Sequence, residues 1–589
     1  MSGQTSAPGK KSRPKRSSPR RRPPRRRASE LRARHKRATR RQFVDHFSLR
    51  ELAVLPLPWP SDTLPGSCPK RRFRSWYRPR SRRSIRRFFG RVKAHPGQRP
   101  SFFEAALHLI DFSSLRWPLV ALTLTASARG QDPFDPLSLL LVCLWKVQEG
   151  LPWTRVATRL AHPQKGALWR RLCGFLPGNT PQESTLRAFR DRLPDTFLNR
   201  VQKSFLALLH RAGLLPPSKP QGYTIVGDGQ LHEARSRHRC HHATATCFQP
   251  VPRPCPADPA TAGRYSCACD TAACQERCAL VPHRDRQAAF IIYSRQERRA
   301  GQQTVVHIDK AVFGYRSMSA RLVDPRFHCA WNIHTDLLPA NADEGTHFAP
   351  HFRAACENLP EKRVGDVIYD SACGEQACLD AVYDLGGIPL FDVRADASDG
   401  QTARWAERGY DDHGHPLCHQ GLPLTFQGVD RSRAQPRARW VWLQACQRSP
   451  QGEVPGCPYL KKRRGQYVYV GRSLPDGSYR LARLVPHGTR LWKKRTAWRN
   501  TSESRNSSLE SRGLLRFPDY GRSHGAFLVL AADVLENLCT LARLVYEATL
   551  LDDRFQPLQE GKRTEIPANI IPIAPQEVDQ AFEEARPLG

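Results

Sequence analysis

The sequence predicts an α/β protein that carries inserted segments and is preceded by a helical domain and a basic tail. Three observations predict this class. Apolar residues recur at helical spacing before residue 219, and short β-rich runs associated with an acid recur after residue 220. Arg, Lys, Pro and Ser dominate the first 42 residues. The chain of 589 residues is too long for one compact core, and its apolar content of 40% suffices for two or three domains.

The net charge of +39 is far larger than solubility requires. Such an excess attracts polyanions, of which nucleic acid is the commonest, and an acidic membrane surface is the alternative. The start of the chain lacks the apolar stretch of a signal peptide. Residues 526–551, the longest apolar run, are interrupted by Asp533, Glu536 and Arg543. We therefore expect no membrane span and a cytoplasmic, nucleoid-associated protein.

Residues 1–42 contain too few apolar side chains to bury surface, which predicts a disordered basic tail. Residues 43–98 read as a basic linker in which arginines alternate with aromatic residues such as Trp76 and Phe88. This pattern suits base stacking combined with phosphate contacts. It equally suits a basic helix whose aromatic side chains pack on the body of the protein.

Residues 99–219 are expected to form a helical DNA-binding domain. Asp135 is a plausible N-cap, followed by Pro136 at the first position of an apolar helix. In "TPQESTLRAFRDRL" the apolar residues recur three and four positions apart, which is the spacing of one helix face. Arg187 and Arg190 lie largely off that face. They are candidates for DNA contact, and a solvated charged face is the alternative interpretation.

Residues 220–402 show the alternation of strand and helix patterns that is typical of an α/β domain. Asp228 follows the β-rich run "YTIV", and Asp370 follows the run "DVIY" before a helix and a further strand. Carboxylates at such positions project from a rigid sheet and can share divalent cations such as Mg²⁺. Composition indicates four further segments: a Cys-rich insertion at 238–283, an inserted subdomain at 403–480, long helices at 481–555 and a C-terminal tail at 556–589.

The Cys-rich insertion has the composition of a zinc-binding segment. A dense group of Cys and His residues can form one or two tetrahedral Zn²⁺ sites, which would be structural. Its spacings match no standard zinc finger, so unligated cysteines are the alternative. Eighteen cysteines in a reducing compartment argue against disulfides. The candidate zinc ligands are Cys240, Cys247, Cys267, Cys269, Cys274 and Cys278. A looser second group contains Cys418, Cys446 and Cys457.

The order of these segments resembles the Asp-Asp-Glu transposases of bacterial insertion sequences, members of the RNase H-like, retroviral-integrase superfamily. "IVGDGQ" resembles the strand of the first catalytic Asp, and "VIYDSACGEQACLDAVYDLGGIPLF" the strand and helix of the second. "RNTSESRNSSLESRGLLRFPDYG" is similar to the helix of the catalytic Glu. The likeness covers most of residues 130–550. It implies an RNase H-like mixed sheet with helices, following a helical N-terminal domain.

The resemblance assigns roles to individual residues. Asp228, Asp370 and Glu503 would be the triad that binds Mg²⁺ or Mn²⁺. Arg499, four residues before Glu503, matches the family's phosphate-contacting Arg, and Arg505 is a second candidate for phosphate contact. Such an enzyme would nick double-stranded DNA at the ends of its element and join the freed 3′ hydroxyl to target DNA. Pairing of two ends implies a homodimer on DNA.

The family's pattern is incomplete in the helix of Glu503. Thr496 stands where the family often has Tyr, and Glu510 stands where it often has Lys. Two alternatives therefore remain: a catalytically inactive, zinc-stabilised DNA-binding protein derived from a transposase, and an RNase H-like nuclease that cleaves without joining. A chromatin-like packaging protein would explain the charge but not the pairing of strands with acids.

Overall fold

The computed structural model describes a helical unit, a mixed sheet with its own helices, and a small second sheet. The described residues are 55–58, 73–95, 100–123, 132–218, 221–235, 285, 287–297, 305–392, 415–418, 421, 423–430, 437–441, 467–470, 484–485 and 489–551. The predicted tails at 1–42 and 556–589 and the Cys-rich insertion at 238–283 lie outside them, as do all six candidate zinc ligands.

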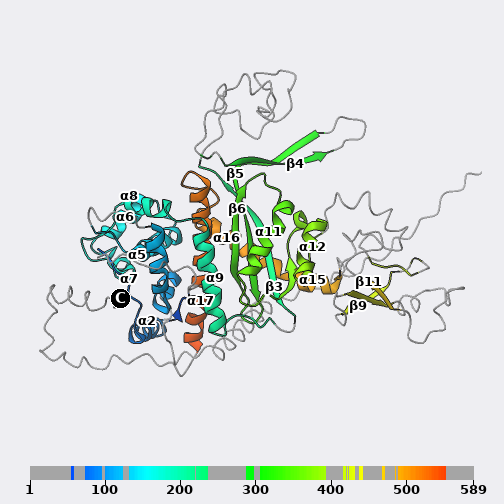
Figure 1. Cartoon of the computed structure of the whole chain (residues 1–589), viewed down its shortest axis with the longest axis horizontal. Coiled ribbons are helices and arrows are strands. Elements are labelled where there is room, and N and C mark those ends of the chain that lie inside the picture. The colour runs from blue at the N-terminus through cyan, green and yellow to red at the C-terminus, as the bar shows by residue number, and fades with distance from the viewer. Residues whose placement is uncertain are drawn as a thin grey trace, which may run out of the picture.

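The helical unit lies beside the sheet (Figure 1). Its α5 begins where the sequence predicts, because the Asp135 carboxylate accepts a hydrogen bond of 3.1 Å from the Leu137 amide. The same carboxylate forms a buried ion pair of 3.1 Å with Arg116. The helices are α2 (Arg82–Ala94), α3 (Phe102–Leu109), α4 (Arg116–Thr123), α5 (Pro136–Gln148), α6 (Trp153–Ala161), α7 (Ala167–Cys173), α8 (Glu183–Asp191) and α9 (Thr196–Arg211). Two short strands, β1 (Leu55–Pro56) and β2 (Ile110–Asp111), pair in parallel.

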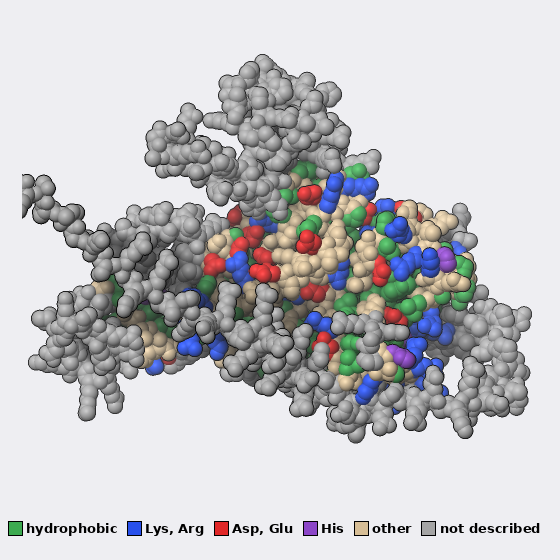
Figure 2. All heavy atoms as spheres, turned by 180° about the vertical axis from the view of Figure 1, so that it is seen from behind, with side chains coloured by type: hydrophobic (Ala, Val, Ile, Leu, Met, Phe, Trp, Pro, Cys, Tyr) green, Lys and Arg blue, Asp and Glu red, His purple; other side chains and the backbone are tan. Residues whose placement is uncertain are grey.

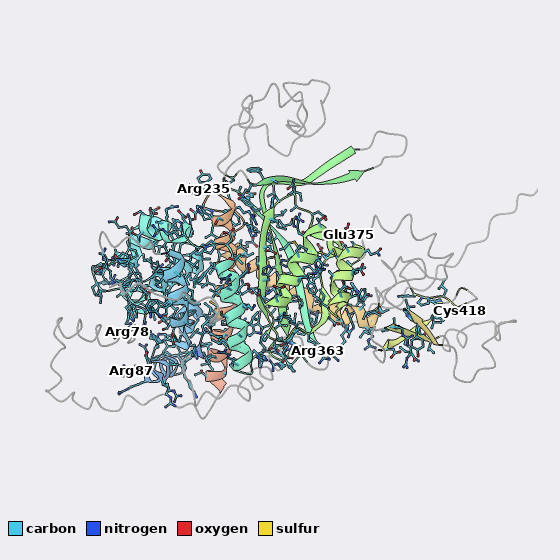
Figure 3. All side chains as sticks on the ribbon, viewed as in Figure 1. Arg78, Arg87, Arg235, Arg363, Glu375 and Cys418 are labelled. Atoms are coloured by element: carbon cyan, nitrogen blue, oxygen red, sulfur yellow. The ribbon has the colours of Figure 1, made fainter. Side chains whose placement is uncertain are left out.

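The aromatic residues of the basic linker pack on the body of the protein. Tyr77 and Phe89 have no exposed surface, and Phe88 stacks on His108 with a ring separation of 4.3 Å. This confirms the packing interpretation for these side chains. The arginines of α2 lie on its outer face, where Arg82, Arg83, Arg86, Arg87 and Arg91 are exposed. Figure 3 shows Arg78 and Arg87 at the margin of the helical unit that is remote from the sheet.

A mixed sheet forms the centre of the molecule, as the sequence predicts. Its main order is β6-β5-β3-β7-β8, in which β5 is antiparallel to β3 and β6 while β7 and β8 run parallel to β3. A further strand, β4, pairs with the part of β5 that extends beyond β3. The strands are β3 (Tyr223–Glu233), β4 (Ala289–Glu297), β5 (Val305–Asp324), β6 (Cys329–Pro339), β7 (Val364–Ile368) and β8 (Ile388–Pro389).

Helices cover both faces of this sheet (Figure 1). On one face lie α11 (Glu344–Glu357) and α12 (Gln376–Asp384), and on the other lie α9, α16 (Asn500–Ser511) and α17 (Arg522–Leu551). The alternation of β5 distinguishes the faces. Arg316 pairs with Glu344 of α11, whereas the Ser317 hydroxyl lies 3.5 Å from the Arg505 guanidinium of α16.

The long helix α17 is shared by the helical unit and the sheet. It packs on α3, α5 and α9 and also on β6. Its length and apolar composition would allow it to span a membrane, but 83% of its most apolar window is buried inside the protein. Its apolar surface is therefore already covered by the chain's own elements, which is the situation of a core helix.

The predicted insertion at 403–480 contains a small antiparallel sheet of order β11-β10-β9. Its strands are β9 (Thr425–Asp430), β10 (Arg437–Val441) and β11 (Tyr467–Val470). Trp440 is buried there against Phe426 in an edge-to-face contact with ring centroids 5.4 Å apart. After the insertion, α15 (Arg490–Thr496) and the short helix η7 (Ala497–Arg499) lead directly into α16.

Candidate functional site

Two of the predicted acids lie level with each other on adjacent strands. Val226 of β3 is paired with Ile368 of β7, and these strands are parallel. Asp228 lies two residues after Val226, and Asp370 lies two residues after Ile368. Asp228 is still within β3, whereas Asp370 starts the short helix η5 (Ser371–Cys373) and accepts a hydrogen bond of 2.9 Å from the Ala372 amide. The register of the sheet thus brings the two carboxylates to the same edge of the structure.

A third carboxylate, Glu344, joins this pair from the first residue of α11. The helix starts there because Asp343 is its N-cap and accepts a 2.9 Å hydrogen bond from the Thr346 amide. Glu344 is 8% exposed and forms an ion pair with Arg316 of β5. Glu344, Asp370 and Cys373 each offer a ligand atom, and these atoms all lie within 4.8 Å of one another. Asp228 is not in that group, but its charge acts on Glu344, and that of Asp370 acts on both. We refer to Asp228, Glu344 and Asp370 as the acidic site.

The glycines on either side of Asp228 make room for this site. A Cβ on Gly229 would lie 2.4 Å from the Oε1 atom of Glu344, and a Cβ on Gly227 would lie 1.9 Å from the ring of Tyr369. Since alternate residues of a strand face opposite sides, both glycines face α11 while Asp228 faces α16. Glycine within a strand often marks such a close approach of another group.

The pKa values of Glu344 and Asp228 are raised, first by burial and then by neighbouring negative charge. Burial, followed by the neighbouring charge of Asp370, raises the pKa of Glu344 to about 7, against the opposing effect of Arg316. Burial and Asp370 likewise raise the pKa of Asp228. Buried acids that repel one another in this way stabilise a bound cation, because the cation removes the repulsion between them.

Helix α16 approaches Asp228 from the other face of the sheet. The Asn506 amide donates a hydrogen bond of 2.8 Å to the Asp228 carboxylate, and this bond and the charge of Arg499 partly offset the rise in the pKa of Asp228. Arg499 also forms an ion pair of 2.7 Å with Asp392. Glu503 is exposed. It lies four residues after Arg499 and three before Asn506, so it shares their helix face.

Glu503 does not complete a cluster with the two aspartates in this structure. Among the described residues, the groups of three potential ligands whose atoms lie within 4.8 Å of one another do not include it. Asp228 is absent from these groups as well: Glu344 and Asp370 lie together, Asp228 is coupled to them through its charge, and Glu503 shares the α16 face of Asn506.

Arg505 is fully buried, which does not fit its expected contact with a DNA phosphate. Its guanidinium makes two contacts with Asp533 of α17, of 2.8 Å from Nε and 2.9 Å from Nη2. This bidentate pair fixes α16 on α17. The interpretation of Arg505 as a phosphate contact failed because its partner, Asp533, lies 28 residues further along the chain and cannot be recognised from the residues around Arg505.

Arg187 and Arg190 both contact Asp519, on the segment that precedes α17. Arg190 is 3% exposed and lies 3.3 Å from that carboxylate, so it does not fit the expected contact with DNA either. Arg187 lies 3.3 Å from Asp519, and its side chain is 40% exposed. Lys146 and the Trp153 indole complete the shell of Asp519, at 3.9 and 3.0 Å. The two arginines therefore attach α8 to the segment of Asp519. Of the two, Arg187 is the one whose side chain remains partly exposed.

Glu344 and Asn506 are the site residues that sequence reasoning missed. An acid that follows an Asp N-cap is common in the first turn of a helix, so "ADEGTHF" carried no sign of a further role for Glu344. The signal that existed was the pair of glycines in "VGDGQ". Two glycines inside a strand indicated that other groups approach Asp228 closely, without showing which ones.

The residues of the acidic site fit a hard divalent cation. Asp228, Glu344 and Asp370 offer carboxylate oxygens, which Mg²⁺ and Mn²⁺ prefer. Burial raises the pKa of the Cys373 thiol well above its usual value, so this thiol stays protonated and is a poor ligand. The oxygen ligands match the metal that the sequence resemblance implies.

The comparisons with known proteins add no relative from which a function can be transferred. No protein-family model matches the chain, and no curated protein matches it.

Proposed function

We propose that this chain is a metal-dependent DNA transposase that nicks the ends of its element and joins the 3′ hydroxyl to target DNA. The observation that carries this proposal is the position of Asp228 and Asp370. They lie level at two parallel neighbours in the sheet order β6-β5-β3-β7-β8, and the buried acid Glu344 lies beside Asp370. The mixed order, with antiparallel strands followed by parallel ones, supports an RNase H-like fold.

The acidic site supplies what phosphoryl transfer needs. A pair of divalent cations held by such carboxylates activates the attacking oxygen and stabilises the leaving oxygen. Asp228 and Asp370 would hold the metal, with Glu344 beside Asp370 and Glu503 reaching in from α16. Asn506 orients the Asp228 carboxylate through its hydrogen bond of 2.8 Å. Arg499 would brace a phosphate next to that carboxylate.

Exposed cations on the helix that leads into α16 support DNA as the substrate. Arg490, Lys493 and Lys494 of α15 are exposed, and α15 leads directly into α16. The exposed arginines of α2 form a second basic surface. Contacts of this type go to phosphates and position DNA without reading its sequence. Figure 2 shows both acidic and basic side chains on the rear face, so the described part of the protein is not uniformly basic as a packaging protein would be.

The experiment is a strand-transfer assay with full-length protein, DNA of the element ends, target DNA and Mg²⁺. Asp228→Asn and Asp370→Asn should lower nicking and joining by roughly 10²-fold or more, because metal ions contribute several kcal/mol to such reactions. Both variants should still bind DNA. Asp384→Asn, an exposed acid at the end of α12, is the matched control. Unchanged product formation by Asp228→Asn would refute the site.

The same assay separates the alternatives. Glu503→Gln and Glu344→Gln show which acid is the third essential carboxylate, since only an acid needed for metal binding abolishes both steps. Wild-type protein that binds end DNA but forms no product would indicate the inactive DNA-binding protein. Nicked DNA without joined molecules would indicate the nuclease.

The basic surface of α15 has its own test. Replacement of Arg490, Lys493 and Lys494 by Ala should weaken DNA binding for all sequences. It should also reduce the salt dependence of log K by about 2–3, close to one for each phosphate that the variant no longer neutralises. Arg353→Ala, an exposed arginine of α11, is the control for the removal of a surface charge. An unchanged salt dependence in the triple variant would exclude α15 from the interface.

A further inference from the structure

A second group of potential metal ligands lies on the face of the sheet that α11 covers. His334 and Asp336 are two residues apart on β6, so both side chains face α11, which carries His351. The Oδ2 atom of Asp336 lies 2.7 Å from Nδ1 of His351 and 3.2 Å from Nε2 of His334. One ligand atom from each of the three residues lies within 4.8 Å of the other two. We refer to these residues as the His–Asp–His cluster.

The contacts of this cluster converge on a single point. Both imidazoles contact the same oxygen of Asp336, which has two lone pairs and can accept a hydrogen bond from each ring. The other nitrogen of each ring, Nδ1 of His334 and Nε2 of His351, is buried and has no hydrogen-bond partner among the described residues. The nitrogens that would bind an ion at the cluster are the other two, Nε2 of His334 and Nδ1 of His351, which contact the Asp336 oxygen.

Burial fixes the two imidazoles of the cluster. His351 is 2% exposed and His334 is 8% exposed, so their positions are fixed by packing. The Asp336 side chain is 37% exposed, so part of this residue is in contact with solvent. A site with three protein ligands and one open position takes a water molecule as its fourth ligand.

We propose that His334, Asp336 and His351 bind one Zn²⁺ ion. Two imidazole nitrogens and one carboxylate oxygen suit this cation, whereas Mg²⁺ prefers oxygen ligands alone. The site differs from the acidic site in its ligands and from the Cys-rich insertion in its lack of thiolates. It does not depend on the proposed transposase activity.

Zinc in this cluster would join β6 to the middle of α11. His351 lies seven residues, or two helical turns, after Glu344 on the same helix. The ion would therefore fix the helix that holds Glu344 over β3.

The test counts zinc bound to full-length protein that has been stripped with a chelator and reloaded with Zn²⁺. By plasma mass spectrometry, Asp336→Asn and His351→Gln should each bind one ion fewer per chain than wild type. The matched control is His347→Gln, the same substitution one turn earlier on α11 and outside the cluster. It should bind as many ions as wild type. Equal zinc content in wild type and both cluster variants would overturn the proposal.

Cobalt identifies the ligands, because the cysteines can also bind metal. The difference between the Co²⁺ spectra of wild type and Asp336→Asn should show d–d bands without thiolate-to-cobalt charge transfer. A difference spectrum dominated by that charge transfer would overturn the proposal. If a variant does not fold, wild-type protein whose thiols have been blocked gives the answer. It should still show the d–d bands of tetrahedral Co²⁺ with nitrogen ligands, which the carboxylates of the acidic site cannot give, and absence of these bands would contradict the site.

Discussion

Glu344→Gln tests the electrostatics of the acidic site independently of any enzyme assay. The substitution keeps the size of the side chain and removes its ability to ionise. In metal-free buffer the wild-type carboxyl group has a pKa of about 7 in the folded protein, against 4.5 as its ordinary value. The folded state therefore binds this proton more tightly than the unfolded state. The resulting stabilisation is fully present below pH 4.5 and is lost as the pH rises through 7.

The size of the effect follows from the shift of the pKa. At about 1.4 kcal/mol for each pK unit, wild type should lose about 3 kcal/mol of stability relative to Glu344→Gln between pH 4.5 and pH 8. Comparing the two proteins at each pH cancels the groups that titrate in both. Mg²⁺ at saturating concentration should reverse much of the wild-type loss, because the cation binds the ionised site.

Thermal unfolding in chelator over a series of pH values measures this difference. Glu357→Gln, an exposed acid at the end of the same helix, is the matched control. A stability difference between wild type and Glu344→Gln that does not change between pH 4.5 and pH 8 would refute the reasoning. So would a difference that changes in the opposite direction, with wild type gaining stability as the pH rises.

Three further predictions concern the framework of the site. Asp533→Ala leaves the buried Arg505 guanidinium without its partner and should cost about 3–5 kcal/mol, measured by denaturant unfolding; a cost below 1 kcal/mol would contradict it. Gly227→Ala forces the Tyr369 ring away from β3 and should cost about 1–3 kcal/mol in the same measurement, and a neutral effect would show that the ring moves freely. Although burial opposes it, Lys146 and the other partners of Asp519 hold the pKa of that carboxyl below its ordinary 3.8. Its contribution is present above pH 3.8 and lost as the pH falls, so Asp519→Asn should flatten part of the acid unfolding curve, and an identical curve would contradict this.

Local features of the fold could be predicted from the sequence because their causes are local. The N-cap at Asp135 and the position of Asp228 and Asp370 beside short β-rich runs follow from neighbouring residues alone. The resemblance then suggested that the two acids meet, and the parallel register of β3 and β7 places them level. The mixed sheet was predicted, and its strand order required the structure.

The partners of side chains could not be predicted because they come from distant parts of the chain. Arg505 and Arg190 looked like surface arginines, since nothing near them in the sequence shows that Asp533 and Asp519 lie against them. Glu344 looked like an ordinary first-turn acid. Its proximity to Asp370 depends on how α11 crosses the sheet, which is set by packing rather than by the residues around Glu344.

The shared helix α17 has a consequence for synthesis of the chain. Domains near the N-terminus usually fold while the ribosome is still at work. Here α3, α5 and α9 of the helical unit, and β6 of the sheet, all pack on a helix that ends at residue 551. Both units therefore keep apolar surface exposed until α17 has left the ribosome. A chain that stops before residue 522 lacks the helix that covers part of each core. Premature termination yields an aggregation-prone product, not a working N-terminal fragment.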